Sequence, residues 1–86
     1  MPYIKQEDRE VFDDHLYELG EMIEKPGEMN YCFTVLIKHY LKNLGKTYQS
    51  INDCIGVLEA AKLEFYRRDV VEYENLKKDI NGDIKI

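Results

Sequence analysis

The chain has 86 residues, of which 44% are hydrophobic and 34% are charged, and its net charge is −5. This composition is typical of one small folded domain and not of a disordered chain. The negative charge excludes the basic surface of a duplex nucleic-acid binder, although a small anionic ligand in a local basic pocket stays compatible with it. The longest apolar run, Val35-Leu36-Ile37, is too short to span a membrane.

We expect a cytoplasmic protein, because the chain does not open with the charged and then apolar leader of a secreted one. Cys32 and Cys54 fall at apolar helical positions and are expected to be free buried thiols. Together with His15 and His39 they lack the spacing of a zinc site, so no metal and no cofactor are predicted.

The pattern of apolar residues and breakers predicts an all-α fold of one domain, residues 1–86. Residues 5–12 form a short helix, and residues 13–25 form a helix that Asp13 or Asp14 caps and Pro26-Gly27 ends.

Residues 28–44 then form a helix with a wide apolar stripe, which Gly45 closes. A long helix follows over residues 47–81, capped by Thr47 or Ser50, and residues 82–86 form a short tail. Because the loop between the last two helices is so short, they should run antiparallel as a hairpin.

The long helix is the feature that points to a partner. With about 30 residues it measures roughly 45–50 Å, whereas a compact domain of this size spans about 30 Å. Its apolar face also changes partway along, where a new edge takes over from the first one. We therefore predict a homo-oligomer, a dimer or higher, whose interface contains Leu63, Tyr66, Val70, Tyr73 and Leu76.

A polar ladder runs beside the apolar face of the long helix at spacings of three and four residues. It could hold a small anionic ligand, with a lysine or arginine for phosphate and tyrosines for stacking. The candidate ligand-binding residues are Asn52, Glu59, Lys62, Tyr66, Arg67, Asp69 and Tyr73. In the simpler interpretation, neighbouring charges of the ladder satisfy one another at a helix seam.

The hypothesis that the protein is an enzyme rests on the carboxylates of the first helices. The spacings Glu18-x-x-Glu21 and Glu21-x-x-Glu24 resemble half of the metal-binding signature of all-α nucleotide pyrophosphohydrolases, in which Mg²⁺ polarises a phosphate. The second half of that signature is missing, since Ser50-x-x-Asp53 and Glu59-x-x-Lys62 are the nearest matches. The sequence therefore favours a protein that is not an enzyme, and no catalytic residues are predicted.

Several phrases of the chain resemble a small family of bacterial and bacteriophage proteins of unknown function. They are the opening Met1-Pro2-Tyr3-Ile4, the segments 27–31 and 48–53, and the helix Leu58-Glu59-Ala60-Ala61-Lys62-Leu63-Glu64-Phe65-Tyr66-Arg67-Arg68. The resemblance implies a bacterial cell or a phage-infected host and no assigned activity. In size and charge balance the chain is also similar to phage proteins that sequester host signalling nucleotides.

Three functions follow from these observations. The first is a non-catalytic, homo-oligomeric binding or interaction protein. The second is a phage protein that sequesters a nucleotide-type ligand between subunits, and the third is a divergent Mg²⁺-dependent nucleotide pyrophosphohydrolase.

Overall fold

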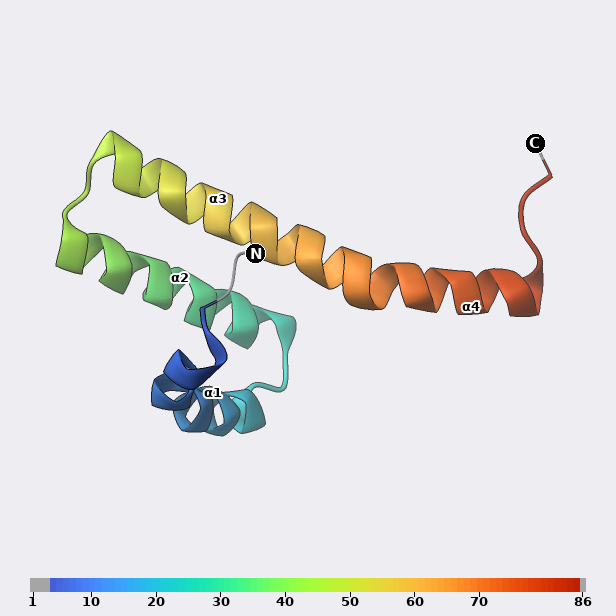
Figure 1. The fold of residues 1–86 in the computed structure, drawn as a ribbon, viewed down its shortest axis with the longest axis horizontal. Helices are drawn as coiled ribbons and strands as arrows, with labels where there is room; N and C mark the ends of the chain where they lie inside the picture. Colours follow the sequence, from blue (N-terminus) through green and yellow to red (C-terminus); the bar gives the residue numbers. More distant parts are fainter. Residues whose placement is uncertain (1–3, 86) are drawn as a thin grey trace. The chain divides into compact units, whose positions relative to one another are not determined.

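A computed structural model describes residues 4–85, and every regular element in that range is helical (Figure 1). In chain order these elements are the 3-10 turn η1 (Gln6–Asp8), α1 (Glu10–Met22), α2 (Pro26–Leu44), α3 (Tyr48–Phe65), the π-helical segment η2 (Tyr66–Val70) and α4 (Val71–Asn81). The predicted all-α fold and its long C-terminal helix are confirmed. Parts of the predicted opening and tail, residues 1–3 and 86, lie outside the described residues.

The chain divides into two compact units, Met1–Ile51 and Asn52–Ile86, which we call unit 1 and unit 2 and describe separately. Unit 1 contains η1, α1, α2 and the first residues of α3. The described part of unit 2 is one uninterrupted helix up to Asn81, followed by residues 82–85. That the whole chain forms a single domain, with α2 and α3 packed as an antiparallel hairpin, stays a prediction.

The predicted boundary between helices 5–12 and 13–25 is wrong. The carbonyl of Arg9 accepts a hydrogen bond from the amide of Asp13 at 3.0 Å, so α-helical bonding is already in place when the chain leaves η1. α1 therefore begins at Glu10. As a result, both aspartates that were expected to cap a helix lie inside one.

The turn between α1 and α2 is organised by Pro26. α1 ends at Met22, and α2 begins at Pro26 itself. Proline suits the first position of a helix because the amide that it lacks would have no partner there. The Glu28 carboxylate accepts hydrogen bonds from the amides of Glu24 at 2.8 Å and Lys25 at 3.0 Å, just ahead of the helix. Pro26 thus starts a helix where the sequence predicted that it ended one.

The connection between α2 and α3 follows the prediction closely. Gly45 ends α2 with a φ of 93°, a conformation that favours glycine. Thr47 and Ser50 then exchange hydrogen bonds: the Thr47 Oγ1 accepts from the Ser50 amide at 3.1 Å, and the Ser50 Oγ accepts from the Thr47 amide at 2.8 Å. Of the two predicted caps the structure selects Thr47, because Ser50 occupies the third position of the helix.

Candidate functional site

The long helix of unit 2 changes its hydrogen-bond pattern at η2. The amide of Val71 bonds to the carbonyl of Tyr66, five residues earlier, whereas an α-helix joins residues four apart. A π turn contains one residue more than an α turn, so everything after η2 is turned back by about 100° relative to a continuous α-helix. The constant α-helical spacing on which the predicted ladder depended is therefore wrong beyond Phe65.

The π turn redirects the polar ladder. The Tyr66 hydroxyl donates a hydrogen bond to Glu74 Oε1 at 2.8 Å, across eight residues. In a continuous α-helix the residue in line with Tyr66 would be Tyr73, seven residues on, and the extra residue gives that place to Glu74. Tyr73 instead lies near Lys77, whose Nζ is 5.7 Å from the ring centroid. Asp69 and Tyr73 thus leave the line of the ladder.

The upstream part of the ladder contains an ion pair. Lys62 Nζ lies 3.5 Å from Glu59 Oε1, and both side chains are exposed. The simpler interpretation, in which neighbouring charges of the ladder satisfy one another, holds for this pair, and exposed pairs contribute only a few tenths of a kcal/mol. Asn52 is also exposed, at the start of unit 2. Of the predicted ligand residues, the structure keeps these upstream residues and Tyr66 on one side of the helix.

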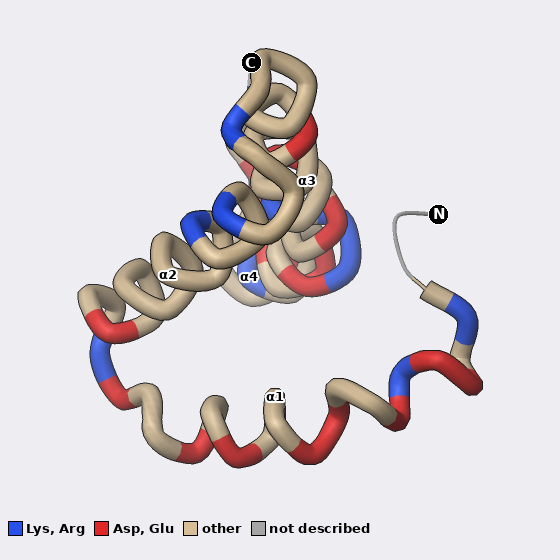
Figure 2. The backbone as a smooth tube through the Cα atoms, turned by 90° about the vertical axis from the view of Figure 1, so that its left-hand side faces the viewer, with Lys and Arg blue, Asp and Glu red and all other residues tan. Residues whose placement is uncertain are grey.

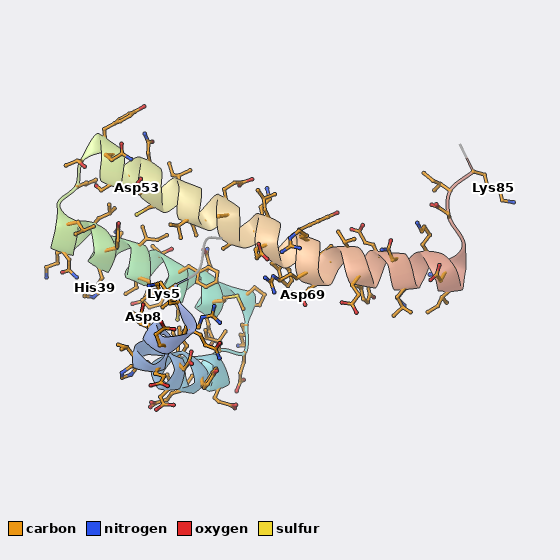
Figure 3. All side chains as sticks on the ribbon, in the orientation of Figure 1. Lys5, Asp8, His39, Asp53, Asp69 and Lys85 are labelled. Atoms are coloured by element: carbon orange, nitrogen blue, oxygen red, sulfur yellow. The ribbon has the colours of Figure 1, made fainter. Side chains whose placement is uncertain are left out.

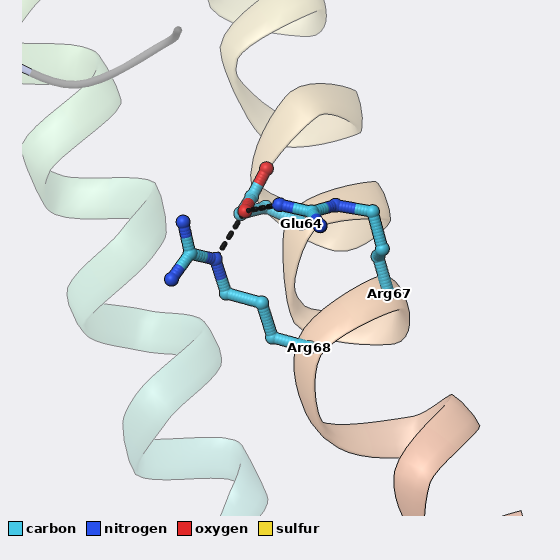
Figure 4. Close-up of polar contacts among 3 residues, drawn as sticks. All are labelled: Glu64, Arg67 and Arg68. Atoms are coloured by element: carbon cyan, nitrogen blue, oxygen red, sulfur yellow. Dashed lines mark hydrogen bonds and ion pairs between the residues drawn. The ribbon is translucent and has the colours of Figure 1, made fainter.

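Glu64 binds both arginines of η2 (Figure 4). Its Oε1 accepts a hydrogen bond from Arg67 Nη2 at 2.6 Å and another from Arg68 Nε. The Glu64 side chain is only 12% exposed, whereas that of Arg67 is 67% exposed. The hydrogen bond from Arg68, aided by Arg67, holds the pKa of Glu64 below its ordinary value, although desolvation acts in the opposite direction. An anionic ligand at Arg67 would have to compete with this carboxylate.

The hydrogen bond to Glu74 raises the pKa of Tyr66 above its ordinary value of about 10. Ionisation of the phenol would remove the donated proton and place a second negative charge beside the carboxylate. Tyr66 is therefore held as a neutral hydrogen-bond donor, and it is a weaker acid than a free tyrosine.

Sequence reasoning missed two residues of this cluster. Glu64 precedes Arg68 by four residues, which is the favourable order for a helical ion pair, so its role could have been found. Glu74 gave no such signal, because its contact with Tyr66 depends on the π turn.

The π turn also changes the predicted interface. Leu63 and Val70 would lie about 20° apart around a continuous α-helix, and the extra residue separates them by about 120°. The same rotation brings Val70 to within about 40° of Phe65, where continuous α-helix would leave about 140°. The structure therefore joins both halves of the helix into one face, which we call the apolar stripe. Its members are Cys54, Leu58, Ala61, Phe65, Val70, Tyr73 and Ile80, with Leu76 at its edge.

Most of the apolar stripe is exposed, on both sides of η2. Cys54 is 8% exposed, whereas Phe65, Tyr73 and Ile80 are exposed. No residue of α4 is buried. The part of the stripe after η2 thus presents large side chains that no other described element of unit 2 covers.

Unit 1 contains the carboxylates on which the pyrophosphohydrolase hypothesis rests. Acidic residues recur along η1 and α1 (Figure 2), and Glu18, Glu21 and Glu24 are all exposed. Among residues 4–85 there is no group of three or more His, Cys, Asp or Glu placed to hold a metal ion. A hollow of about 550 Å³ lies at the α1–α2 turn, where Met29 and Phe33 supply apolar walls.

No helix within the described range is both long and apolar enough to cross a lipid bilayer. Searches of curated proteins and of solved structures found no match. A family model does match, over residues 1–84, so the resemblance of the chain to a family without an assigned role is confirmed. The chain belongs to the family described as a domain of unknown function (DUF6899).

Proposed function

We propose that this chain is a non-catalytic, cytoplasmic binding or interaction protein of bacterial or phage origin that acts as a homo-oligomer. The observation that carries the proposal is the exposed apolar stripe of unit 2. A single helix in water is marginally stable, and helices in proteins gain most of their stability by packing an apolar face. In the described part of unit 2 no second element offers such packing.

The test is the mass of the full chain in solution, measured by sedimentation equilibrium from low to high micromolar concentration. We expect a multiple of the 10.2 kDa chain mass. The mass should fall toward that of one chain on dilution, because association is governed by mass action. A mass of one chain over the whole range would remove the proposal.

A second candidate function is the sequestration of a nucleotide-type anion. The observation that favours it is the convergence of Arg67 and Arg68 on one carboxylate oxygen, since guanidinium groups bind phosphate with the same donors. A ligand phosphate would replace Glu64 as their acceptor.

A panel of mono- and polyphosphate nucleotides tests this second function through the thermal unfolding midpoint. A ligand at 100 times its dissociation constant adds about 2.7 kcal/mol to stability, which is a readily measured shift. The shift should be lost in Arg67→Ala and in Lys62→Ala, and it should grow in Glu64→Gln, which removes the carboxylate that competes for Arg67. If no nucleotide moves the midpoint, or if both alanine variants keep the shift, this function is excluded.

The same samples test the hydrolase hypothesis. Release of phosphate or pyrophosphate with Mg²⁺ would have to appear in the unmodified chain and vanish in Glu18→Gln and in Glu21→Gln. No turnover over hours would end this hypothesis.

A further inference from the structure

The exposed part of the apolar stripe carries opposite charges on either side of one tyrosine. Asp69, Tyr73 and Lys77 follow one another at four-residue spacing, which places them on one face of the helix, a turn apart. Asp69 and Lys77 are exposed, and Tyr73 is 59% exposed. Figure 3 shows Asp69 projecting from the helix just before α4.

The chain itself does not satisfy these charges. Within residues 4–85 the Asp69 side chain makes no hydrogen bond and no ion pair, and the Lys77 side chain approaches only the ring of Tyr73, at 5.7 Å. The charges that precede Asp69 differ in this respect, because Glu64 forms ion pairs with both arginines of η2. The unpaired aspartate and lysine are thus the charges of this face that a partner can use.

The order of these charges decides which pairing of two copies is favourable. In a parallel pair Asp69 faces Asp69 and Lys77 faces Lys77, so both contacts are repulsive. In an antiparallel pair centred on Tyr73, each Asp69 faces a Lys77. A twofold axis makes every such contact occur twice, since the same patch is used by both copies.

We propose that two copies of this chain pair antiparallel through the part of the stripe from Phe65 to Ile80, with Tyr73 at the twofold axis and Asp69 of each copy opposite Lys77 of the other. This inference rests on the proposed homo-oligomer and adds its orientation and register. Phe65, Val70 and Ile80 flank the charged centre and supply the apolar contact.

The available area agrees with a dimer of this kind. Phe65 is 61%, Leu76 55% and Ile80 65% exposed, in addition to Tyr73. With about 150–250 Å² for a whole aromatic side chain, these residues and their neighbours provide roughly 500 Å² on each copy. Two copies would bury about 1,000 Å², which lies at the lower limit for a specific interface. An interface of this size therefore depends on the charge pairs between Asp69 and Lys77 as well as on apolar contact.

A charge-exchange experiment tests the register. Asp69→Lys and Lys77→Asp each replace both attractive contacts by repulsive ones, and we expect each to raise the dimer dissociation constant by about tenfold or more. The double variant Asp69→Lys/Lys77→Asp restores opposite charges across the axis. We expect it to return to within about threefold of the original value. Sedimentation equilibrium measures all four chains, and circular dichroism confirms that each is helical.

Disulfide cross-linking tests the orientation without altering both charges at once. In a chain whose free thiols Cys32 and Cys54 are replaced by alanine, Asp69→Cys and Lys77→Cys are prepared separately and then mixed. An antiparallel pair cross-links the two different chains and leaves each variant alone largely unlinked. A parallel pair gives the reverse pattern.

The outcomes separate this inference from the function on which it rests. A monomeric unmodified chain overturns both. An oligomer whose single variants associate normally, whose double variant stays as weak as the single ones, or whose cross-links join like positions overturns the antiparallel register alone.

Discussion

α3 and α4 are stretches of one continuous helix, but they are supported in different ways. α3 begins with the reciprocal hydrogen bonds of Thr47 and Ser50 and contains the buried Cys54. α4 continues directly from η2, where the Val71 amide bonds to the Tyr66 carbonyl, and none of its residues is buried. Helix continuity alone therefore does not stabilise the second stretch. Its apolar residues need a contact that the described part of unit 2 does not provide.

The largest expected effect comes from a charge placed in the centre of the exposed stripe. Tyr73→Glu buries an unpaired carboxylate in any interface that forms there, and we expect it to weaken self-association by at least about tenfold. Asn75→Glu adds the same charge about 160° away around the helix and should leave association unchanged. Sedimentation equilibrium compares the two. Equal weakening by both variants would show that the stripe is not the interface.

The next effect concerns the direction in which the apolar face of α4 points around the helix axis, relative to that of α3. Deletion of Arg67 allows η2 to become α-helical while the α4 face keeps its direction, so association should change by less than about threefold. Insertion of one alanine after Arg67 turns α4 by about 100° relative to α3 and should weaken association by about tenfold. If the deletion weakens association as much as the insertion does, η2 has a role other than keeping the two faces in phase.

The stability of α3 can be lowered by removing a hydrogen bond at its first turn. Thr47→Ala removes the oxygen that accepts the Ser50 amide, and we expect a loss of about 1 kcal/mol in the free energy of unfolding. Thr47→Ser keeps a hydroxyl at the same position and should lose much less. Urea unfolding followed by circular dichroism measures both variants. An alanine variant as stable as the serine variant would mean that Thr47 does not cap the helix.

The smallest expected effect is a pH dependence at the junction of the two stretches. Because its pKa is lowered in the folded state, Glu64 contributes stability that is complete above its ordinary pKa of about 4.5. This stability is lost as the pH falls through the lower folded-state pKa, where the unfolded chain takes up the proton first. Glu64→Gln should therefore be less stable at pH 7 and should lose less stability between pH 5 and 3.

Thermal unfolding from pH 3 to 7 measures this difference, with Glu72→Gln as a control at an exposed carboxylate of α4. The role assigned to Glu64 is refuted if the two variants show the same pH profile.

Much of the fold follows from local chemistry that a sequence displays. Glycines that adopt a positive φ mark helix ends: Gly45 closes α2 as predicted, and Gly82 follows the predicted last residue of the long helix. The error at Pro26 has a simple cause, because a proline that cannot continue one helix is equally suited to begin the next. The error at Asp13 arose since a 3-10 turn passes directly into α1, which leaves no gap for a capping residue.

The candidate site was less predictable than the fold. The pair of Glu59 and Lys62 depends only on three-residue spacing in a regular helix, so it could be foreseen. The contacts between residues before and after η2 could not be predicted from the sequence, because each of them depends on a turn with one additional residue.

The pattern of residues is enough to predict that this protein is all-α, that α2 ends at Leu44, and that the last helix is long and partly apolar. The contact between Tyr66 and Glu74, and the position of Val70 on the same face as Phe65, are seen only in three dimensions. The physical reason is that α and π turns use the same residues and differ by one residue in the span of a hydrogen bond. No side chain of Tyr66–Val70 reveals that choice, yet it sets the direction of every residue that follows.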